Sequence, residues 1–253
     1  MPLSIKDRVA AVSNSTMMYW YPRIRDQITP RSVFVAVPWA NGDWMEEGVP
    51  RAFVEEVQHA ARAFEYPVFL RTDHASGKHN WKNSCFVPDA KDLGKHIYEV
   101  LEANESAFPL GMPYHWLVVR EYIPMETIFT AFHGDMPINH EHRYFLRDHK
   151  LQCQHPYWPK GAFARDEERG LGNLPNGWRR KLDMISKCLH SGNEAVIERI
   201  GRWFDGWWSV DFSHGADGAW YLIDMARGEV SFHMPSCPYA PEEMREQYGR
   251  LEE

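Results

Sequence analysis

Hydrophobic and polar positions follow each other along the chain in patterns that predict both strands and helices. Short runs rich in β-branched and aromatic residues predict strands over 33–37, 68–71, 84–87, 116–123, 127–133, 141–147, 151–155, 207–213 and 220–225. Apolar residues at helical spacing predict helices over 45–64, 89–104, 178–189, 193–205 and 241–248. The order of these elements is typical of an α+β fold.

The arrangement of the elements predicts lobes. A strand and a helix come first, a small mixed segment follows, and an antiparallel sheet with helices ends the chain. Asp148 and His149 predict a hairpin turn in that sheet, and residues 215–218 predict another. Residues 156–177 carry proline, glycine and charge and predict no regular element. We expect three parts, over residues 1–65, 66–123 and 124–253.

Composition narrows the classes of function. The chain has 253 residues, of which 44% are hydrophobic, so we expect a buried core rather than disorder. A formal charge of −7 argues against a general nucleic-acid binder. No apolar run approaches the roughly 20 residues of a membrane span, and the start does not resemble a signal peptide. We therefore expect a cytoplasmic protein, with four scattered cysteines as reduced thiols.

Two aspartates stand in the predicted hairpin formed by strands 207–213 and 220–225. Asp211 lies in its first strand and Asp224 in its second. A tight hairpin brings such carboxylates to one spot, and hard oxygen ligands suit Mg²⁺. Two solvated acids near turns are the alternative that this pattern alone leaves open.

The strand 141–147 carries a second candidate group. Alternate residues of a strand share a face, so Glu141 and Arg143 point to the same side. A carboxylate there suits a metal or a ribose, and an arginine suits phosphate oxygens. A surface ion pair across strands is the alternative.

Two further candidates lie in the first half of the chain. Arg71 ends a predicted strand, and Lys78 follows it in a polar loop that contains Gly77. Such cations flanking a loop can hold phosphates, although the loop is no Walker A motif. The strand that ends in Glu121, Tyr122 and Ile123 offers backbone groups to a base. The alternative for the Lys78 segment is an ordinary polar loop, and the alternative for the Glu121 strand is a plain buried strand.

Together and in this order, the four segments resemble the ATP-grasp superfamily. The resembling parts are the Arg71 strand and its loop, the sequence VVREYI, the E-x-R-x-F strand and the hairpin VDF…WYLID. The likeness covers about residues 66–232 and is strongest to compact phage and bacterial ATP-grasp proteins. An assembly-chaperone branch of the superfamily shares the E-x-R-x-F element. The resemblance implies an α+β ATP-grasp fold, in which two α/β lobes hold ATP between them.

The resemblance also implies roles for residues. Arg71 and Lys78 would hold the ATP phosphates, and Arg143 the γ-phosphate. The remaining contacts would be Glu121, Tyr122 and Ile123 to adenine, Glu126 to ribose, Glu141 beside Arg143, and Asp211 and Asp224 to Mg²⁺. Two positions depart from the superfamily pattern: Ala226 replaces an asparagine that helps to bind metal, and Arg71 replaces a lysine.

The expected function is an ATP- and Mg²⁺-dependent ligase that joins a carboxylate to an amine through an acylphosphate. Arg143 and Lys78 would be its catalytic cations. A peptide or protein is one possible substrate. The alternatives are an ATP-binding assembly factor that forms no bond and a kinase-like phosphotransferase. His140 and His142 share a strand, but no Cys/His spacing of the structural type predicts a zinc site.

Overall fold

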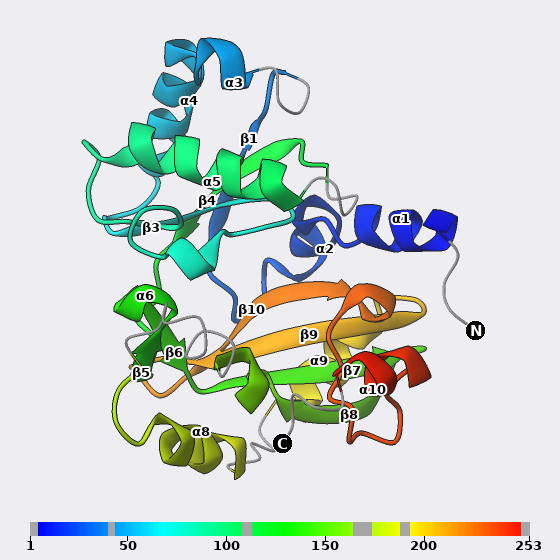
Figure 1. Ribbon diagram of the computed structural model, residues 1–253. Helices are drawn as coiled ribbons and strands as arrows, with labels where there is room; N and C mark the ends of the chain where they lie inside the picture. Colours follow the sequence, from blue (N-terminus) through cyan, green and yellow to red (C-terminus); the bar gives the residue numbers. More distant parts are fainter. Residues whose placement is uncertain (1–4, 40–43, 108–112, 164–173, 188–192, 249–253) are drawn as a thin grey trace. The chain divides into compact units, whose positions relative to one another are not determined.

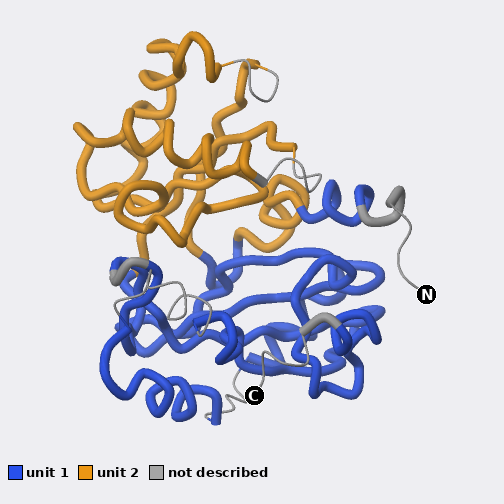
Figure 2. Tube along the Cα trace, viewed as in Figure 1, with its two compact units in different colours: residues 1–15, 26–29, 124–253 blue, residues 16–25, 30–123 orange. Residues whose placement is uncertain are grey.

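A computed structural model describes residues 5–39, 44–107, 113–163, 174–187 and 193–248 (Figure 1). The chain divides into two compact units (Figure 2). Unit 1 comprises residues 1–15, 26–29 and 124–253, and unit 2 comprises residues 16–25 and 30–123. Residues 1–65, which we expected as a lobe of their own, are therefore shared between both units. None of the described helices is long and apolar enough to cross a membrane.

Unit 2 is built on a four-stranded antiparallel sheet in the order β1-β4-β2-β3. Its strands are β1 (Ser32–Ala36), β2 (Val68–Thr72), β3 (Phe86–Val87) and β4 (Trp116–Glu121). Its helical segments are α2 (Met17–Ile24), α3 (Trp44–Glu47), α4 (Arg51–Ala61), η1 (Lys78–Asn80) and α5 (Leu93–Ala107).

The two faces of this sheet differ because alternate side chains point to opposite sides. Val68 and Leu70 of β2 are buried with Val119 of β4 in one core, to which α4 and α5 contribute Val57 and Ile97. The opposite face carries Arg71. The pairing of β1 with β4 explains why residues 30–65 belong to unit 2.

Unit 1 contains a second four-stranded antiparallel sheet, in the order β10-β9-β7-β8, and a hairpin, β5-β6. The strands are β5 (Thr127–Ala131), β6 (Met136–Asn139), β7 (Glu141–Arg147), β8 (Lys150–Pro156), β9 (Trp207–His214) and β10 (Trp220–Arg227). The helical segments are α1 (Ile5–Ser13), α6 (Phe132–Asp135), α8 (Trp178–Lys187), α9 (Glu194–Gly201), η3 (Gly228–Val230) and α10 (Glu242–Tyr248).

The strand pattern of β7 separates the two faces of this sheet. Tyr144 is fully buried, and its hydroxyl is 3.5 Å from the Asn193 amide nitrogen beside α9. Arg143 points to the opposite face, where its guanidinium donates to the carbonyl of Phe232, just after η3. Helix α9 thus covers one face, and the segment after η3 covers part of the other (Figure 1).

The outer edge of β10 is covered by residues from the start of the chain. Leu222 donates its N–H to the carbonyl of Ile28 at 2.9 Å. The Thr29 hydroxyl donates to the Leu222 carbonyl at 2.8 Å, and Arg227 N–H donates to the Ser15 hydroxyl at 2.8 Å. The edge strand therefore has polar partners on both of its sides.

Most expected elements are present, but local chemistry changes some of them. The helix expected over 45–64 is interrupted, because Gly48 has a φ of +79° and Pro50 is the N-cap of α4. The strand expected over 127–133 ends at Ala131, where α6 and β6 follow. Helices α1 and α2 were not predicted. The hairpin turn at Asp148 and His149 is confirmed, with φ of +47° and +73°.

Candidate functional site

Three strands of unit 1 place Arg143, Asp211 and Asp224 in one row. Arg143 of β7 is the register partner of Asp211 of β9, which in turn is the partner of Asp224 of β10. A bulge between Leu222 and Asp224 shifts the register of β10. Because directly opposite residues point to the same face of a sheet, one arginine and two aspartates are neighbours there.

Arg143 is held by an ion pair in the interior. Its Nε lies 2.7 Å from Asp211 Oδ1, and a terminal nitrogen lies 2.8 Å from Oδ2. The side chains are only 12% and 5% exposed. Burial lowers the pKa of Arg143, because it favours the neutral guanidine. The charge and hydrogen bonds of Asp211, with smaller contributions from Tyr157 and Asp224, outweigh burial, so the pKa of Arg143 is raised. The guanidinium also lies 4.6 Å from the centre of the Tyr157 ring.

The neighbouring acids make this row negative. Glu141 precedes Arg143 by two residues and lies on the same face, as the strand periodicity predicted. Its side chain is buried, with 5% exposed. Asp224 is half-buried, and its Oδ1 accepts the N–H of Met225 at 3.1 Å. One arginine against three carboxylates favours the approach of a cation.

The position two residues after Asp224 lacks a polar side chain. Ala226 is the register partner of Ser209. The Ser209 hydroxyl lies 3.4 Å from the Ala226 carbonyl and 2.7 Å from the Ser231 hydroxyl. Glu126, the expected ribose ligand, has Oε2 at 2.6 Å from Nδ1 of His214. Its carboxylate is therefore part of a local pair at the surface.

In unit 2, Arg71 and Lys78 lie near one thiol. Burial raises the pKa of Cys85 to about 12, and the charges of Lys78 and Arg71 act against that rise. Arg71 is 4% exposed, and its guanidinium donates to the carbonyls of Thr72 and His74 at 3.0 and 3.3 Å. This cation thus shapes the start of the loop that it was expected to flank.

The expected adenine segment is anchored at Glu121. Arg31 donates to both carboxylate oxygens of Glu121, at 3.0 and 2.9 Å, and these bonds lower the pKa of Glu121. The ring of Tyr122 packs edge-on against Phe86, with centroids 5.1 Å apart. Ile123 is half-buried. Arg31 was not singled out from the sequence, because a lone arginine before a strand carries no signal.

Comparison with known proteins identifies the fold. No protein-family model matches the chain, and no curated protein is significantly similar to it. Cdc123 from Schizosaccharomyces pombe matches with a TM-score of 0.55 and 14% identity, over 90% of this chain and 87% of that one. A C-terminally truncated Cdc123 from the same organism gives a TM-score of 0.57 at 14% identity, over 98% and 94% of the two chains.

Solved ATP-grasp proteins also match. A RimK-domain ATP-grasp protein from Sphaerobacter thermophilus has a TM-score of 0.41 and 15% identity, over 88% of this chain and 62% of that one. The likeness to Cdc123 shows a shared fold. The α+β class that the sequence predicted is confirmed, and the ATP-grasp fold predicted from the four segments is consistent with the matched structures.

Proposed function

We propose that the chain binds ATP with Mg²⁺ and uses it to join a carboxylate to an amine. The observation that carries the proposal is the row of Arg143, Asp211 and Asp224 across three neighbouring strands. The E-x-R-x-F strand and the acidic hairpin bring these residues together within one unit. The resemblance to ATP-grasp proteins implies that this row would hold the metal and the terminal phosphate.

The residues of the row suit Mg²⁺. Asp211 and Asp224 are hard oxygen donors on one face, as Mg²⁺ requires. Both oxygens of Asp211 accept bonds from Arg143, but a carboxylate has about four lone-pair sites, so it can serve arginine and metal together. Bound there, Mg²⁺ would neutralise charge on the phosphates.

The chain's own part in the reaction is electrostatic positioning. Arg143 is buried and fixed by Asp211 and the Phe232 carbonyl, so little reorganisation is needed when charge develops on a transferring phosphoryl group. The substrate carboxylate would attack the γ-phosphorus, ADP would leave, and the amine would displace phosphate from the acylphosphate. No nucleophilic side chain is needed, since both bonds form between substrate atoms.

The other proposed contacts are those that the resemblance implies. Arg71 and Lys78 would hold phosphate oxygens, and the charges of both act on the pKa of Cys85. Residues 121–123 would contact adenine, with Glu121 kept in place by Arg31. Glu126 remains the proposed contact to ribose, and it would have to exchange His214 for the sugar hydroxyls.

The second candidate is an ATP-binding assembly factor that forms no bond. One observation favours it: Ala226 gives a methyl group where the superfamily pattern has an asparagine, and its neighbour Ser209 is already bonded to Ser231. Fewer metal ligands are compatible with tight nucleotide binding and slow turnover. The substrate pair of the ligase, a peptide or protein among the choices, stays part of the proposal.

The metal assignment is tested with Asp224→Asn. Titration calorimetry with ATP in Mg²⁺ should show affinity at least about tenfold lower than that of the unaltered protein, a difference of about 1.4 kcal/mol. Affinity in EDTA should be equal for both. Asp217→Asn is the matched control, because Asp217 is an exposed acid in the turn of the same hairpin. Equal Mg²⁺ dependence in the Asp224 variant would refute the assignment.

Turnover separates the two candidate functions. The measurement is phosphate release from MgATP with pooled amino acids and peptides as acceptors. Release that requires an added carboxylate supports the ligase. Tight ATP binding with no release under any mixture supports the assembly factor.

A further inference from the structure

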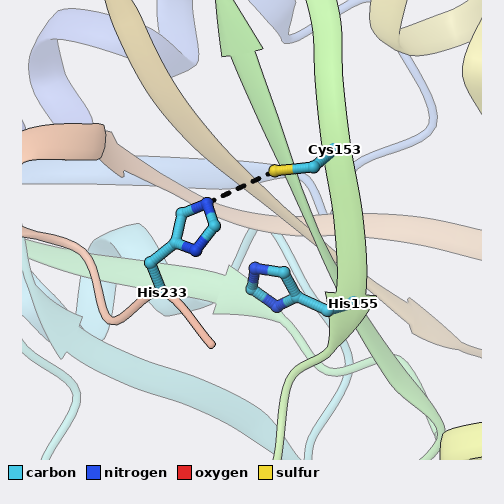
Figure 3. Close-up of side chains that lie close together, drawn as sticks. All are labelled: Cys153, His155 and His233. Carbon is cyan, nitrogen blue, oxygen red and sulfur yellow. Dashed lines mark hydrogen bonds between the residues drawn. The ribbon is translucent and has the colours of Figure 1, made fainter. Parts of the chain in front are cut away.

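A group of sulfur and nitrogen atoms lies on the same sheet face as Arg143. Strand β8 presents Cys153 and His155, two residues apart, and His233 approaches from the segment after η3 (Figure 3). One ligand atom of each residue lies within 4.8 Å of those of the other two. The Cys153 sulfur is 3.3 Å from Nε2 of His233. Thiol and imidazole atoms thus converge from two distant parts of the sequence.

The imidazole of His155 is buried without ordinary hydrogen bonds. His155 is 7% exposed, and neither ring nitrogen makes a hydrogen bond of normal geometry with any residue that the structure describes. Burial, with His233 and Arg143 nearby, lowers its pKa to about 3 although the Pro156 backbone acts against this. A buried polar atom without a well-formed hydrogen bond destabilises the fold. A ligand that accepts the imidazole lone pair would remove that cost.

The ring of His233 is oriented for a ligand at one nitrogen. Nδ1 lies 3.4 Å from the carbonyl of Met234, so Nε2 is directed to Cys153. Metal-bound histidines usually give the second ring nitrogen to a carbonyl or carboxylate in this way, which fixes the tautomer. His233 is fully buried.

A second thiol, Cys237, follows His233 by four residues. Cys237 interacts with the Cys153 thiol through its charge and a hydrogen bond, so that burial and then Cys237 raise the pKa of Cys153. Two hydrogen bonds hold the backbone of Cys237. The Cys237 N–H donates to the Met234 carbonyl at 3.0 Å, and the Arg245 guanidinium donates to the Cys237 carbonyl at 3.1 Å. One thiol and two imidazoles lie within 4.8 Å of one another, and Cys237 is the candidate for a fourth position beside Cys153.

We propose that Cys153, His155, His233 and Cys237 bind one zinc ion in a tetrahedral structural site. Two thiolates with two imidazoles are a typical zinc ligand set. Zinc bonds of about 2.3 Å to sulfur and about 2.0–2.1 Å to nitrogen place ligand atoms about 3.4–3.8 Å apart. The Cys153–His233 separation of 3.3 Å already fits. The other distances among Cys153, His155 and His233 are at most 4.8 Å, so these atoms need to approach by about 1 Å.

The metal would fasten the turn 233–237 to β8. That turn begins next to Phe232, whose carbonyl accepts a bond from Arg143 at 3.0 Å. Zinc would therefore also fix one of the acceptors that hold Arg143 in its row. The proposed zinc site differs from the row of Arg143, Asp211 and Asp224 in its ligands: zinc would bind sulfur and nitrogen, whereas Mg²⁺ would bind carboxylate oxygen.

Two sequence signals precede this cluster: Cys153-x-His155 and His233-x₃-Cys237. Each is short, and they stand far apart in the chain, so their spacing alone does not join them. The sheet pairing and the segment after η3 bring them together. The cysteines were expected as scattered reduced thiols, and Cys85, Cys153 and Cys237 are free in the structure. Cys153 and Cys237 interact with each other in unit 1, while Cys85 belongs to unit 2.

The first experiment needs no variant. The full chain is purified under reducing conditions, its metal content is measured, and the metal is removed with a chelator. Anaerobic titration with Co²⁺ and no nucleotide should then give one equivalent per chain, with the visible bands of tetrahedral cobalt and a thiolate charge-transfer band. Zn²⁺ should displace the cobalt, because zinc is preferred at such sites.

The second experiment assigns the ligands. Cys153→Ser, His155→Gln, His233→Gln and Cys237→Ser should each lower Zn²⁺ affinity at least about 100-fold, since even outer contacts cost 10–100-fold. Cys85→Ala and His149→Gln are the matched controls, one a buried cysteine of unit 2 and one an exposed histidine. Both should keep the cobalt spectrum. Asp224→Asn should also keep it, so this test is independent of the ATP proposal.

The outcomes decide the proposal. No stoichiometric Co²⁺ or Zn²⁺ in the reduced protein, an octahedral cobalt spectrum, or equal binding by all four variants would each overturn it. A disulfide between Cys153 and Cys237 that persists in reductant would do so as well. If a variant does not fold, as judged by circular dichroism, the stoichiometry and spectrum of the unaltered chain still decide.

Discussion

Replacement of Arg143 by methionine tests the buried ion pair on which the row of unit 1 depends. Methionine keeps much of the volume and removes the charge. The Nε–Oδ1 distance of 2.7 Å and the second bond of 2.8 Å show that both carboxylate oxygens of Asp211 lose their partner. Asp224, directly opposite, would then face Asp211 with no cation between them.

The expected loss is large because both groups are out of water. Removing one member of a buried pair costs about 3–5 kcal/mol, since the other charge stays buried and uncompensated. The side chains of Arg143 and Asp211 are 12% and 5% exposed, which supports the full range. Arg143→Met with Asp211→Asn should lose less than the two single changes together, because the second change removes that charge.

Urea denaturation measures these losses. Circular dichroism and tryptophan fluorescence are followed together, so that unfolding confined to one unit is seen. Arg51→Met is the matched control: its salt bridge to Glu55 has a similar distance, 2.8 Å, but the side chains are 93% and 59% exposed. That change should alter the free energy of unfolding by no more than about 0.5 kcal/mol. A loss below about 1 kcal/mol for Arg143→Met would refute the burial argument.

Three further results are expected. Gly228→Ala should cost about 1–3 kcal/mol, because the new Cβ would lie 2.4 Å from the ring of Trp207; unchanged urea stability would contradict the packing. Arg31→Met should lower the melting temperature most at neutral pH, because Arg31 lowers the pKa of Glu121. The stability that comes from this ion pair is present above the ordinary Glu pKa of 4.5 and is lost as the pH falls through the pKa of Glu121 in the folded chain. A difference in melting temperature that does not depend on pH would exclude this linkage. Burial raises the pKa of Cys85 to about 12, so iodoacetamide should label this thiol slowly in the folded chain. Labelling as fast as that of glutathione would contradict the raised pKa.

The sequence predicts what depends on short periods and motifs. The alternation in β7 places Glu141 and Arg143 on one face, and the hairpin motif places Asp211 beside Asp224, as the registers show. The sequence does not show that Arg143 is bonded to Asp211. That contact depends on the pairing of β7 with β9, which are separated by β8, α8 and α9.

Other features depend on long-range contacts as well. Helices α1 and α2 are short, and the hydroxyl of Thr16, the N-cap of α2, bonds to Asp73 far along the chain at 2.7 Å. The group of Cys153, His155 and His233 likewise joins two distant segments of the chain. Local patterns therefore predict the strands of the site, and the fold determines which side chains meet.

The covered edge of β10 has a consequence for truncated chains. Ser15, Ile28 and Thr29 occupy the backbone groups of β10 that would otherwise be open to another strand. A version that begins after residue 31 would expose that edge to solvent. Open strand edges pair readily with other chains, so such a version should self-associate as its concentration rises, even if its sheet still forms. By covering the edge of β10, Ser15, Ile28 and Thr29 should therefore prevent this strand from pairing with other chains.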